Sequence, residues 1–251
     1  MPAALTVAVA ETDRLLALPG AGASVLSAAE RRRFAAVRTE RARADFVAAR
    51  LLARLCVAWR TGGAVRDVVL EQRCPRCAGP HGRPRVRGSR CGVSLAYADG
   101  VVAASAADHP VGIDIERLPG PDPGPGFGRP GQFLTRGELD RVRGSPAPRS
   151  AFLRIWVRKE ALVKLTAAGL PGMAGIDLAQ LPLCEAGPGG PHRIGRLLLY
   201  DLSGTGSDVI GAVAVTAPGH PAGRGCPAAS GIRSLTLDDL IDTLSSQGEA
   251  P

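Results

Sequence analysis

Hydrophobic and polar residues alternate over several short segments of the chain, whereas two longer segments repeat their apolar residues at helical spacing. The helical pattern covers residues 27–60, as one long helix or a broken pair, and again residues 150–169. Each of these segments is followed by alternating segments that predict a hairpin, at residues 92–107 and 196–217. The chain therefore contains the order helix and then hairpin twice.

This repeated order predicts an α+β fold of two similar halves with a pseudo-twofold relation and an active site in the cleft between them. The expected N-terminal half covers residues 1–110, the C-terminal half residues 111–225, and a tail residues 226–251. The first helical segment opens with Ser27 and Glu30, the pattern of a capping box.

A short strand, VGIDIE at residues 111–116, contains the first candidate chemistry. Side chains on a strand alternate between its two faces, so the apolar residues of this strand face a core. The opposite face holds Gly112, Asp114 and Glu116, two carboxylates beside a glycine that leaves room for a ligand. For an isolated D-x-E pattern, an exposed polar face is the commoner structure.

The second candidate segment is WVRKEALVK, residues 156–164, inside the second helical pattern. Lys159 falls within the apolar arc of this helix, and Glu160 and Lys164 lie at its edge, one turn apart. A lysine in a buried arc is costly unless an anion pairs with it, although a snorkelling lysine and an ordinary Glu–Lys pair are equally compatible with the pattern. Together the two segments supply three carboxylates and two lysines, which suits Mg²⁺ and a diphosphate.

The overall charge of the chain points in the same direction. The formal net charge is +8, and all basic residues other than Lys159 and Lys164 are arginines. This balance favours an anionic partner without identifying it. The sequence shows no signal peptide and no apolar stretch long enough to span a membrane, so we expect a cytoplasmic protein.

The two segments, in this order and with WVRKEALVK beginning forty residues after Glu116, resemble the signature motifs of the Sfp-type 4′-phosphopantetheinyl transferases. Gly82-Arg83-Pro84 resembles a coenzyme A-binding segment of that family. The basic run between Phe34 and Arg54 resembles the family's helix near the 3′-phosphate of coenzyme A, and Phe133-Leu134-Thr135 with Glu138 resembles the approach to its second helix. The resemblance covers residues 27–216 and implies two similar α+β halves.

By this resemblance the chain is an Mg²⁺-dependent enzyme. It would transfer the phosphopantetheine arm of coenzyme A to a serine of an apo acyl or peptidyl carrier protein and release 3′,5′-ADP. The resemblance implies a monomer with neither nucleic-acid nor membrane partners. The implied magnesium ligands are Asp114, Glu116 and Glu160, and the implied catalytic residues are Glu160, Lys164 and Lys159. The residues implied to bind coenzyme A are Arg83, Pro84, Tyr97, Arg41, Arg50, Lys159 and Lys164.

Two other functions compete with this interpretation. Cys74, Cys77, His81 and Cys91 could form a zinc knuckle in a nucleic-acid-binding protein, but one CxxC with irregular partners is a weak signal, which favours the absence of zinc. An Mg²⁺-dependent phosphodiesterase would use similar carboxylates and lysines. A member of the family that has lost activity is the third alternative, because Ala96-Tyr97-Ala98 replaces the family's Ser-His-Ser or Ser-His-Thr.

The replacement of histidine by Tyr97 gives a direct test. A tyrosine hydroxyl donates one hydrogen bond but carries no positive charge near neutral pH. We expect Tyr97→His to keep or improve the apparent affinity for coenzyme A, measured from the dependence of transfer rate on its concentration. A large loss of affinity would instead give the tyrosine a required role of its own.

Overall fold

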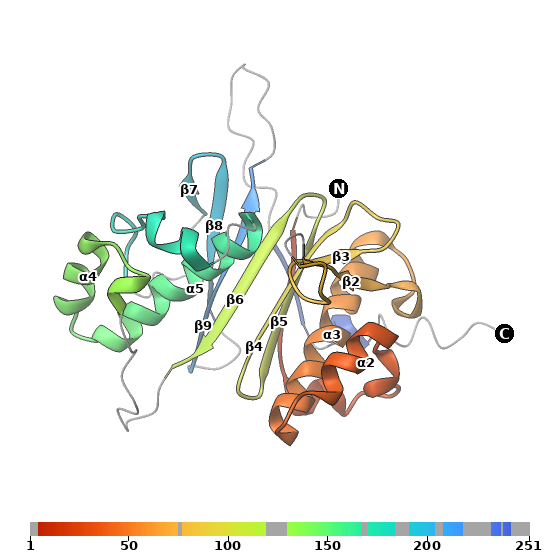
Figure 1. The fold of residues 1–251 in the computed structure, drawn as a ribbon. Helices are drawn as coiled ribbons and strands as arrows, with labels where there is room; N and C mark the ends of the chain where they lie inside the picture. Colours follow the sequence, from red (N-terminus) through yellow and green to blue (C-terminus); the bar gives the residue numbers. More distant parts are fainter. Residues whose placement is uncertain are drawn as a thin grey trace, which may run out of the picture.

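A computed structural model describes residues 5–74, 77–118, 130–166, 170–183, 191–203, 208–217, 232–236 and 238–241 (Figure 1). Its strands form a six-stranded sheet in the order β10-β1-β5-β4-β3-β2 and a four-stranded sheet in the order β6-β9-β8-β7. The strand bounds are β1 Leu5–Glu11, β2 Leu70–Gln72, β3 Pro84–Val86, β4 Gly92–Ala98, β5 Val101–Ala107, β6 Val111–Arg117, β7 His192–Ile194, β8 Leu197–Ser203, β9 Val209–Thr216 and β10 Ile232–Leu235.

The first helical pattern forms a broken pair, α2 (Ala28–Ala35) and α3 (Glu40–Thr61), after the short helix α1 (Thr12–Leu16). The predicted capping box of Ser27 and Glu30 is present and begins α2. Thr39 accepts a hydrogen bond from the backbone N–H of Ala42 and begins α3, so the break has its own N-cap. α3 packs along β4 and β5 and covers one face of the larger sheet.

The second helical pattern forms α5 (Pro148–Thr166), preceded by α4 (Arg136–Arg143). α5 begins two residues before the predicted start, with proline in the first turn, where its missing N–H costs nothing. Thr135 and Glu138 form a second capping box at the start of α4.

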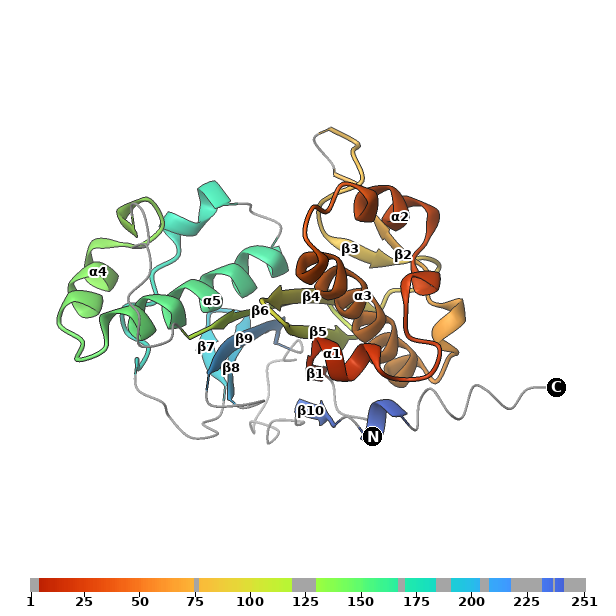
Figure 2. The same cartoon turned by 90° about the horizontal axis from the view of Figure 1, so that it is seen from below.

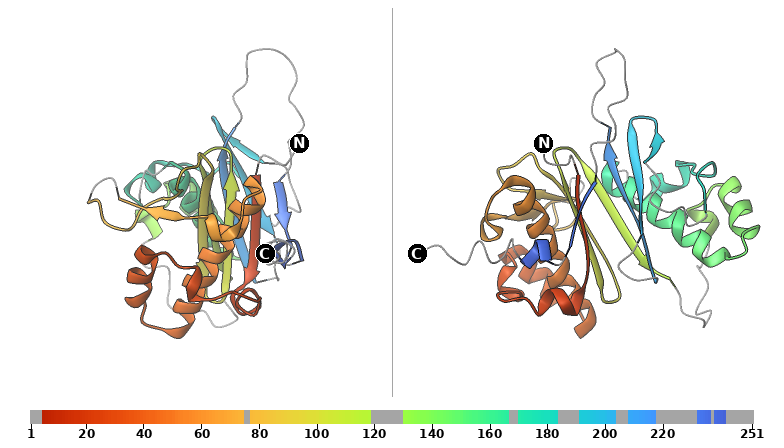
Figure 3. Two further views of the ribbon diagram at one scale, coloured as in Figure 1. Left: turned by 90° about the vertical axis from the view of Figure 1, so that its right-hand side faces the viewer. Right: turned by 180° about the vertical axis from the view of Figure 1, so that it is seen from behind.

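Both predicted hairpins are present, as β4–β5 and β8–β9. The β4–β5 turn is formed by Asp99 and Gly100, which both have positive φ, as a two-residue turn that joins twisted strands requires. The segment at residues 119–131, rich in proline and glycine, lies almost entirely outside the described residues. Strand β10 was not predicted from the sequence; it pairs in parallel with β1 and brings residues 232–235 to the N-terminal sheet (Figure 3). None of the described helices is long and apolar enough to cross a membrane.

The two sheets share a strand order around their long helices. In each sheet the first strand of its half pairs with the last strand, and the remaining strands follow in reverse chain order. This gives β1-β5-β4-β3 in the larger sheet and β6-β9-β8-β7 in the smaller one. Both α3 and α5 lie on the same side of the strands β4, β5 and β6 (Figure 2). The mixed helix and sheet content agrees with the predicted α+β class, whereas the pseudo-twofold relation and the domain limits stay predictions.

The two sheets meet where β6 lies beside β4. The backbone N–H of Ile113 donates to Ser94 Oγ at 3.1 Å, which satisfies a donor on the edge of β6 that faces β4. As predicted, the apolar residues of β6 face a core, where they pack with residues of β1, β5 and β9: Val111, Ile113 and Ile115. This core fixes the direction in which the opposite face of β6 points.

Gly112 corrects one expectation about that opposite face. A Cβ atom at this position would lie 2.0 Å from the carbonyl oxygen of Ala161 and 2.6 Å from the backbone nitrogen of Leu165. The missing side chain therefore makes room for the backbone of α5 and not for a ligand. This close approach sets the last turns of α5 directly against β6.

We expect Gly112→Ala to destabilise the protein by about 3 kcal/mol, because two backbone atoms of α5 must move to admit the methyl group. The thermal midpoint should fall by roughly 6–12 °C, measured by circular dichroism. Gly175→Ala is the control, since nothing lies within 4 Å of its added Cβ. Equal midpoints for the two variants would show that α5 is not tightly seated on β6.

Candidate active site

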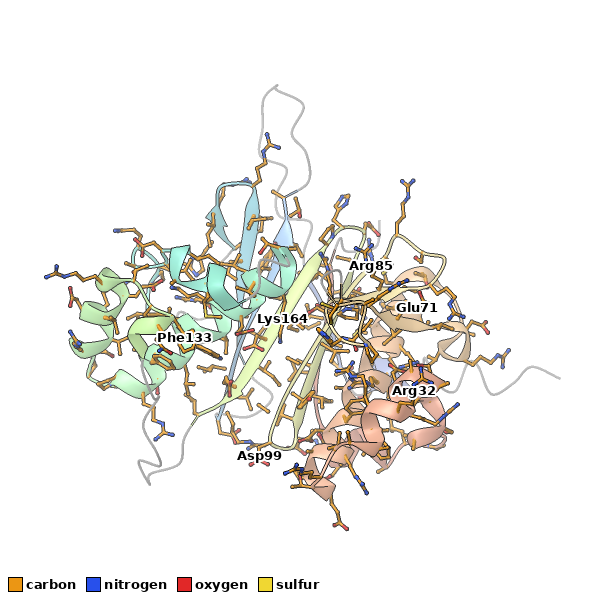
Figure 4. All side chains as sticks on the ribbon, in the orientation of Figure 1. Arg32, Glu71, Arg85, Asp99, Phe133 and Lys164 are labelled. Atoms are coloured by element: carbon orange, nitrogen blue, oxygen red, sulfur yellow. The ribbon has the colours of Figure 1, made fainter. Side chains whose placement is uncertain are left out.

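Asp114 on β6 and Lys164 on α5 form the centre of the candidate site. Lys164 Nζ donates to Asp114 Oδ1 at 2.7 Å and to the backbone carbonyl of Ile113 at 3.0 Å. Figure 4 shows Lys164 beside β6. The second oxygen of the Asp114 carboxyl group, Oδ2, is buried without a hydrogen-bond partner. A buried acceptor without a protein partner is uncommon, and this oxygen is suited to a cation or a further donor.

Two further carboxyl groups, Glu116 and Glu160, surround this pair and share one electrostatic environment with it. Burial raises the pKa of Asp114, only partly opposed by Lys164. Burial and then the Asp114 charge raise the pKa of Glu116 and that of Glu160. Three acidic groups gathered around a single lysine form an excess of negative charge.

Trp156 supports this cluster from the preceding turn of α5. Its side chain hydrogen-bonds to Glu116, which lowers the pKa of that carboxyl group. Its ring packs edge-on against Phe133 at 5.2 Å between centroids and stacks on Phe152 at 6.1 Å. The indole therefore holds Glu116 through a ring that is itself fixed by aromatic neighbours.

The segment that contains these residues matches a known family model. Residues 110–209 match the family model of the 4′-phosphopantetheinyl transferase superfamily. The match covers 100 of the 251 residues and includes all of β6, α4 and α5. No curated protein matches the chain at a significant level. The superfamily transfers phosphopantetheine from coenzyme A, so the matched segment supports a transferase of that kind.

Lys159 does not lie at this site. Its side chain is fully buried and forms a 2.6 Å ion pair with Glu138, which is equally buried. Its ammonium also donates to the backbone carbonyls of Phe133 at 2.8 Å and Met173 at 3.3 Å. Phe133 lies toward α4, apart from Lys164 (Figure 4). The prediction that Lys159 contacts phosphate is therefore wrong, because all three of its protons already have acceptors.

Arg50 also has a structural position instead of the predicted ligand contact. It is 3% exposed, lies over the ring of Phe46 at 3.2 Å, and donates to the carbonyl of Phe46. Its Nε lies 3.7 Å from Glu30, which Arg54 binds at 2.6 Å. This buried group joins α2 to α3. Burial, followed by the charge of Arg33, lowers the pKa of Arg50 to about 10.

Arg83 crosses from the N-terminal sheet to α5. Its Nη1 donates to the backbone carbonyl of Leu165 at 3.0 Å, next to Lys164 in the sequence. An arginine at the carboxyl end of a helix satisfies a free carbonyl and the helix dipole. Burial and then the charge of Arg85 lower the pKa of Arg83. The hydrogen bond ties the Gly82-Arg83-Pro84 segment to the carboxyl end of α5.

The other predicted ligand residues occupy more open positions. Tyr97 on β4 is 46% exposed and lies close enough to Arg50 to interact with it electrostatically. Pro84 begins β3. Arg41 is paired with Asp13 at 2.5 Å near the Asp99-Gly100 turn, so its predicted contact with coenzyme A stays a prediction.

Sequence reasoning did not single out Arg85 as a site residue or recognise Glu138 as the partner of Lys159. The capping-box pattern of Thr135 and Glu138 was a signal for the position of Glu138, but not for its second role as a buried counterion. Two cavities, of about 470 and 650 Å³, are lined by other parts of the chain and contain none of the predicted site residues.

We expect Lys159→Met to unfold at much lower urea concentration than the wild type, with a loss of about 3–5 kcal/mol, because the Glu138 carboxylate would remain buried without a counterion. Lys164→Met is the comparison: its side chain is 31% exposed, and the loss of stability should be far smaller. A Lys159→Met variant with wild-type stability and weaker coenzyme A binding would instead support a direct contact between Lys159 and phosphate.

Proposed function

We propose that this protein is an Sfp-type 4′-phosphopantetheinyl transferase that modifies a serine of an apo acyl or peptidyl carrier protein. The observation that carries this proposal is the convergence of Asp114, Glu116 and Glu160 with Lys164, inside the segment that matches the superfamily. The donors suit a hard cation and a diphosphate, which are the two components that the reaction requires.

The three carboxyl groups fit Mg²⁺. They offer oxygen donors only, one of which, Asp114 Oδ2, is buried and without a partner. Burial raises the pKa of all three groups, and the charge of Asp114 raises those of Glu116 and Glu160 further, so a cation bound among them would favour their charged forms. Mg²⁺, when bound, would neutralise charge on a diphosphate and on the phosphate that leaves. Asp114, Glu116 and Glu160 are the residues that we propose hold it.

Arginines on the neighbouring elements provide the opposite charge. Arg33 and Arg50 interact electrostatically, as do Arg83 and Arg85, and each pair contains a like-charge repulsion that an anion would relieve. Arg33 is further connected to the Arg83 segment, since it bonds Gln72, whose side chain donates to the carbonyl of Gly82 at 2.6 Å. Arg33, Arg83 and Arg85 are suited to the 3′-phosphate and diphosphate of coenzyme A, whereas Arg50 stays buried against Phe46.

The chemical step is a substitution at the β-phosphorus of coenzyme A. A bond forms from the serine oxygen of the carrier protein to phosphorus, and the bond from phosphorus to the bridging oxygen breaks with its electron pair leaving on 3′,5′-ADP. We assign Glu160 to accept the serine proton, because its raised pKa makes it a stronger base than an ordinary glutamate. We assign Lys164, which pairs with Asp114, to stabilise negative charge on the leaving phosphate.

The test of this function is incubation with coenzyme A, Mg²⁺ and apo carrier proteins from fatty acid, polyketide and nonribosomal peptide synthesis, followed by intact mass measurement. The carrier protein should gain one phosphopantetheine. Hydrolysis of coenzyme A without a carrier protein would indicate a phosphodiesterase instead, and coenzyme A that stays intact with every carrier would contradict the proposed transferase.

In the same assay we expect Glu160→Gln to lower the transfer rate by at least about 100-fold, because the base and one metal ligand are removed together. Glu11→Gln, an exposed acid on β1, should transfer at the wild-type rate. Near-normal turnover by Glu160→Gln would remove Glu160 from the mechanism.

The Glu160→Gln variant should also be more stable than the wild type without metal. A raised pKa in the folded state means that stability is lost as pH rises above the ordinary value of 4.5 and stays lost at neutral pH. Without metal at pH 7, the thermal midpoint should rise by roughly 2–4 °C. Added Mg²⁺ should raise the midpoint of the wild type more than that of the variant.

A further inference from the structure

A second group of metal-binding side chains lies in the loop between β2 and β3, outside the site described above. One donor atom each from Cys74, Cys77 and His81 lies within 4.8 Å of the other two. Among the described residues, no other group of three or more His, Cys, Asp or Glu side chains has its donor atoms this close together. This includes the three acidic residues of the candidate active site. The loop stands out from the N-terminal sheet (Figures 2 and 3).

The side chains within this group already contact one another. Cys77 Sγ lies 2.9 Å from His81 Nε2, so a thiol and an imidazole nitrogen point at the same position. Both residues are exposed, while Cys74 is 9% exposed at the base of the loop. An exposed thiol and ring that turn toward each other, and not into solvent, form a preorganised pair of ligands.

The backbone of the loop is folded around this group. The N–H of Cys74 donates to the carbonyl of Gly79, and so does the N–H of His81, each at 2.9 Å. A Cβ atom on Gly79 would lie 3.1 Å from the His81 ring and 3.2 Å from Cys77 Sγ. A side chain at residue 79 would press on two of the three ligands, so the glycine leaves the space in which they converge.

We propose that Cys74, Cys77 and His81 bind one Zn²⁺ ion. Two thiolates and an imidazole are donors that zinc takes in tetrahedral sites, whereas Mg²⁺ prefers oxygen, so the two metal sites select different ions. On binding, the two thiols release their protons to solvent, and water completes the coordination. Cys91, which the sequence placed with this group, belongs elsewhere: it lies near Cys56 and Arg60, and burial raises its pKa.

The position of the loop gives the ion a structural role. Gly82, with a φ of +96°, packs against the backbone of Cys74, and its carbonyl accepts from Gln72. The next residue is Arg83, which bonds the end of α5. A metal that ties Cys74 to His81 therefore fixes the start of the segment that joins the N-terminal sheet to α5.

The test is a titration of the full-length, metal-free and fully reduced protein with Co²⁺, which reports thiolate ligands by a charge-transfer absorption. We expect one Co²⁺ per chain, loss of the absorption when Zn²⁺ is added, and release of two protons per ion in weak buffer. Cys77→Ser and His81→Ala should each weaken Co²⁺ binding by at least about 100-fold. Cys91→Ser, which also removes a thiol, should bind like the wild type.

Several results would overturn the proposal. They are the absence of a thiolate-to-cobalt absorption in the wild type, equal absorption in Cys77→Ser, or a loss of absorption in Cys91→Ser as large as that in Cys77→Ser. Because the readout is spectroscopic and independent of coenzyme A, it separates zinc binding from the transferase activity: either can fail without the other.

Discussion

The close contact between β6 and α5 is the constraint on which the candidate site depends. Gly112 allows the backbone of α5 to touch the strand, and only at that separation can Lys164 reach both Asp114 and the carbonyl of Ile113. The same contact fixes which turn of the helix faces the strand, so Glu160 joins the two acids of β6. One missing side chain thus brings together residues forty-four or more positions apart in the sequence.

The charges of the protein are divided between two kinds of environment. Lys159 with Glu138 is a buried ion pair, and Arg50 and Arg54 share the buried carboxylate of Glu30; both groups hold helices together. The acidic cluster on β6 and α5 is left with more negative than positive charge, and the arginines near β3 with the reverse. The buried ion pairs stabilise the fold. The unbalanced acidic and basic clusters cost stability by themselves and become favourable only when ligands of opposite charge bind.

Much of the fold could be predicted from periodicity, because helical spacing and strand alternation are local properties. The broken helix, both hairpins and the burial of alternate β6 residues agree with the structure. Periodicity also placed Lys159 in a buried arc, but it could not identify its partner, because Glu138 lies twenty-one residues away on another helix. The same limit explains Arg50 and Cys91: sequence spacing groups residues of one type, whereas their partners are set by packing between elements. β10 was missed because four residues contain too little pattern.

The parallel pairing of β10 with β1 has a consequence for how the chain folds as it is made. Leu5 of β1 leaves the ribosome 227 residues before Ile232 of β10, and within the described part of the chain the edge of β1 opposite β5 is paired by residues 232–235. Until those residues emerge, the growing protein exposes an unpaired strand edge, which is a template for pairing with other chains. Completion of the N-terminal sheet is thus a late event, and this pairing has one of the largest sequence separations in the molecule, a feature that slows folding.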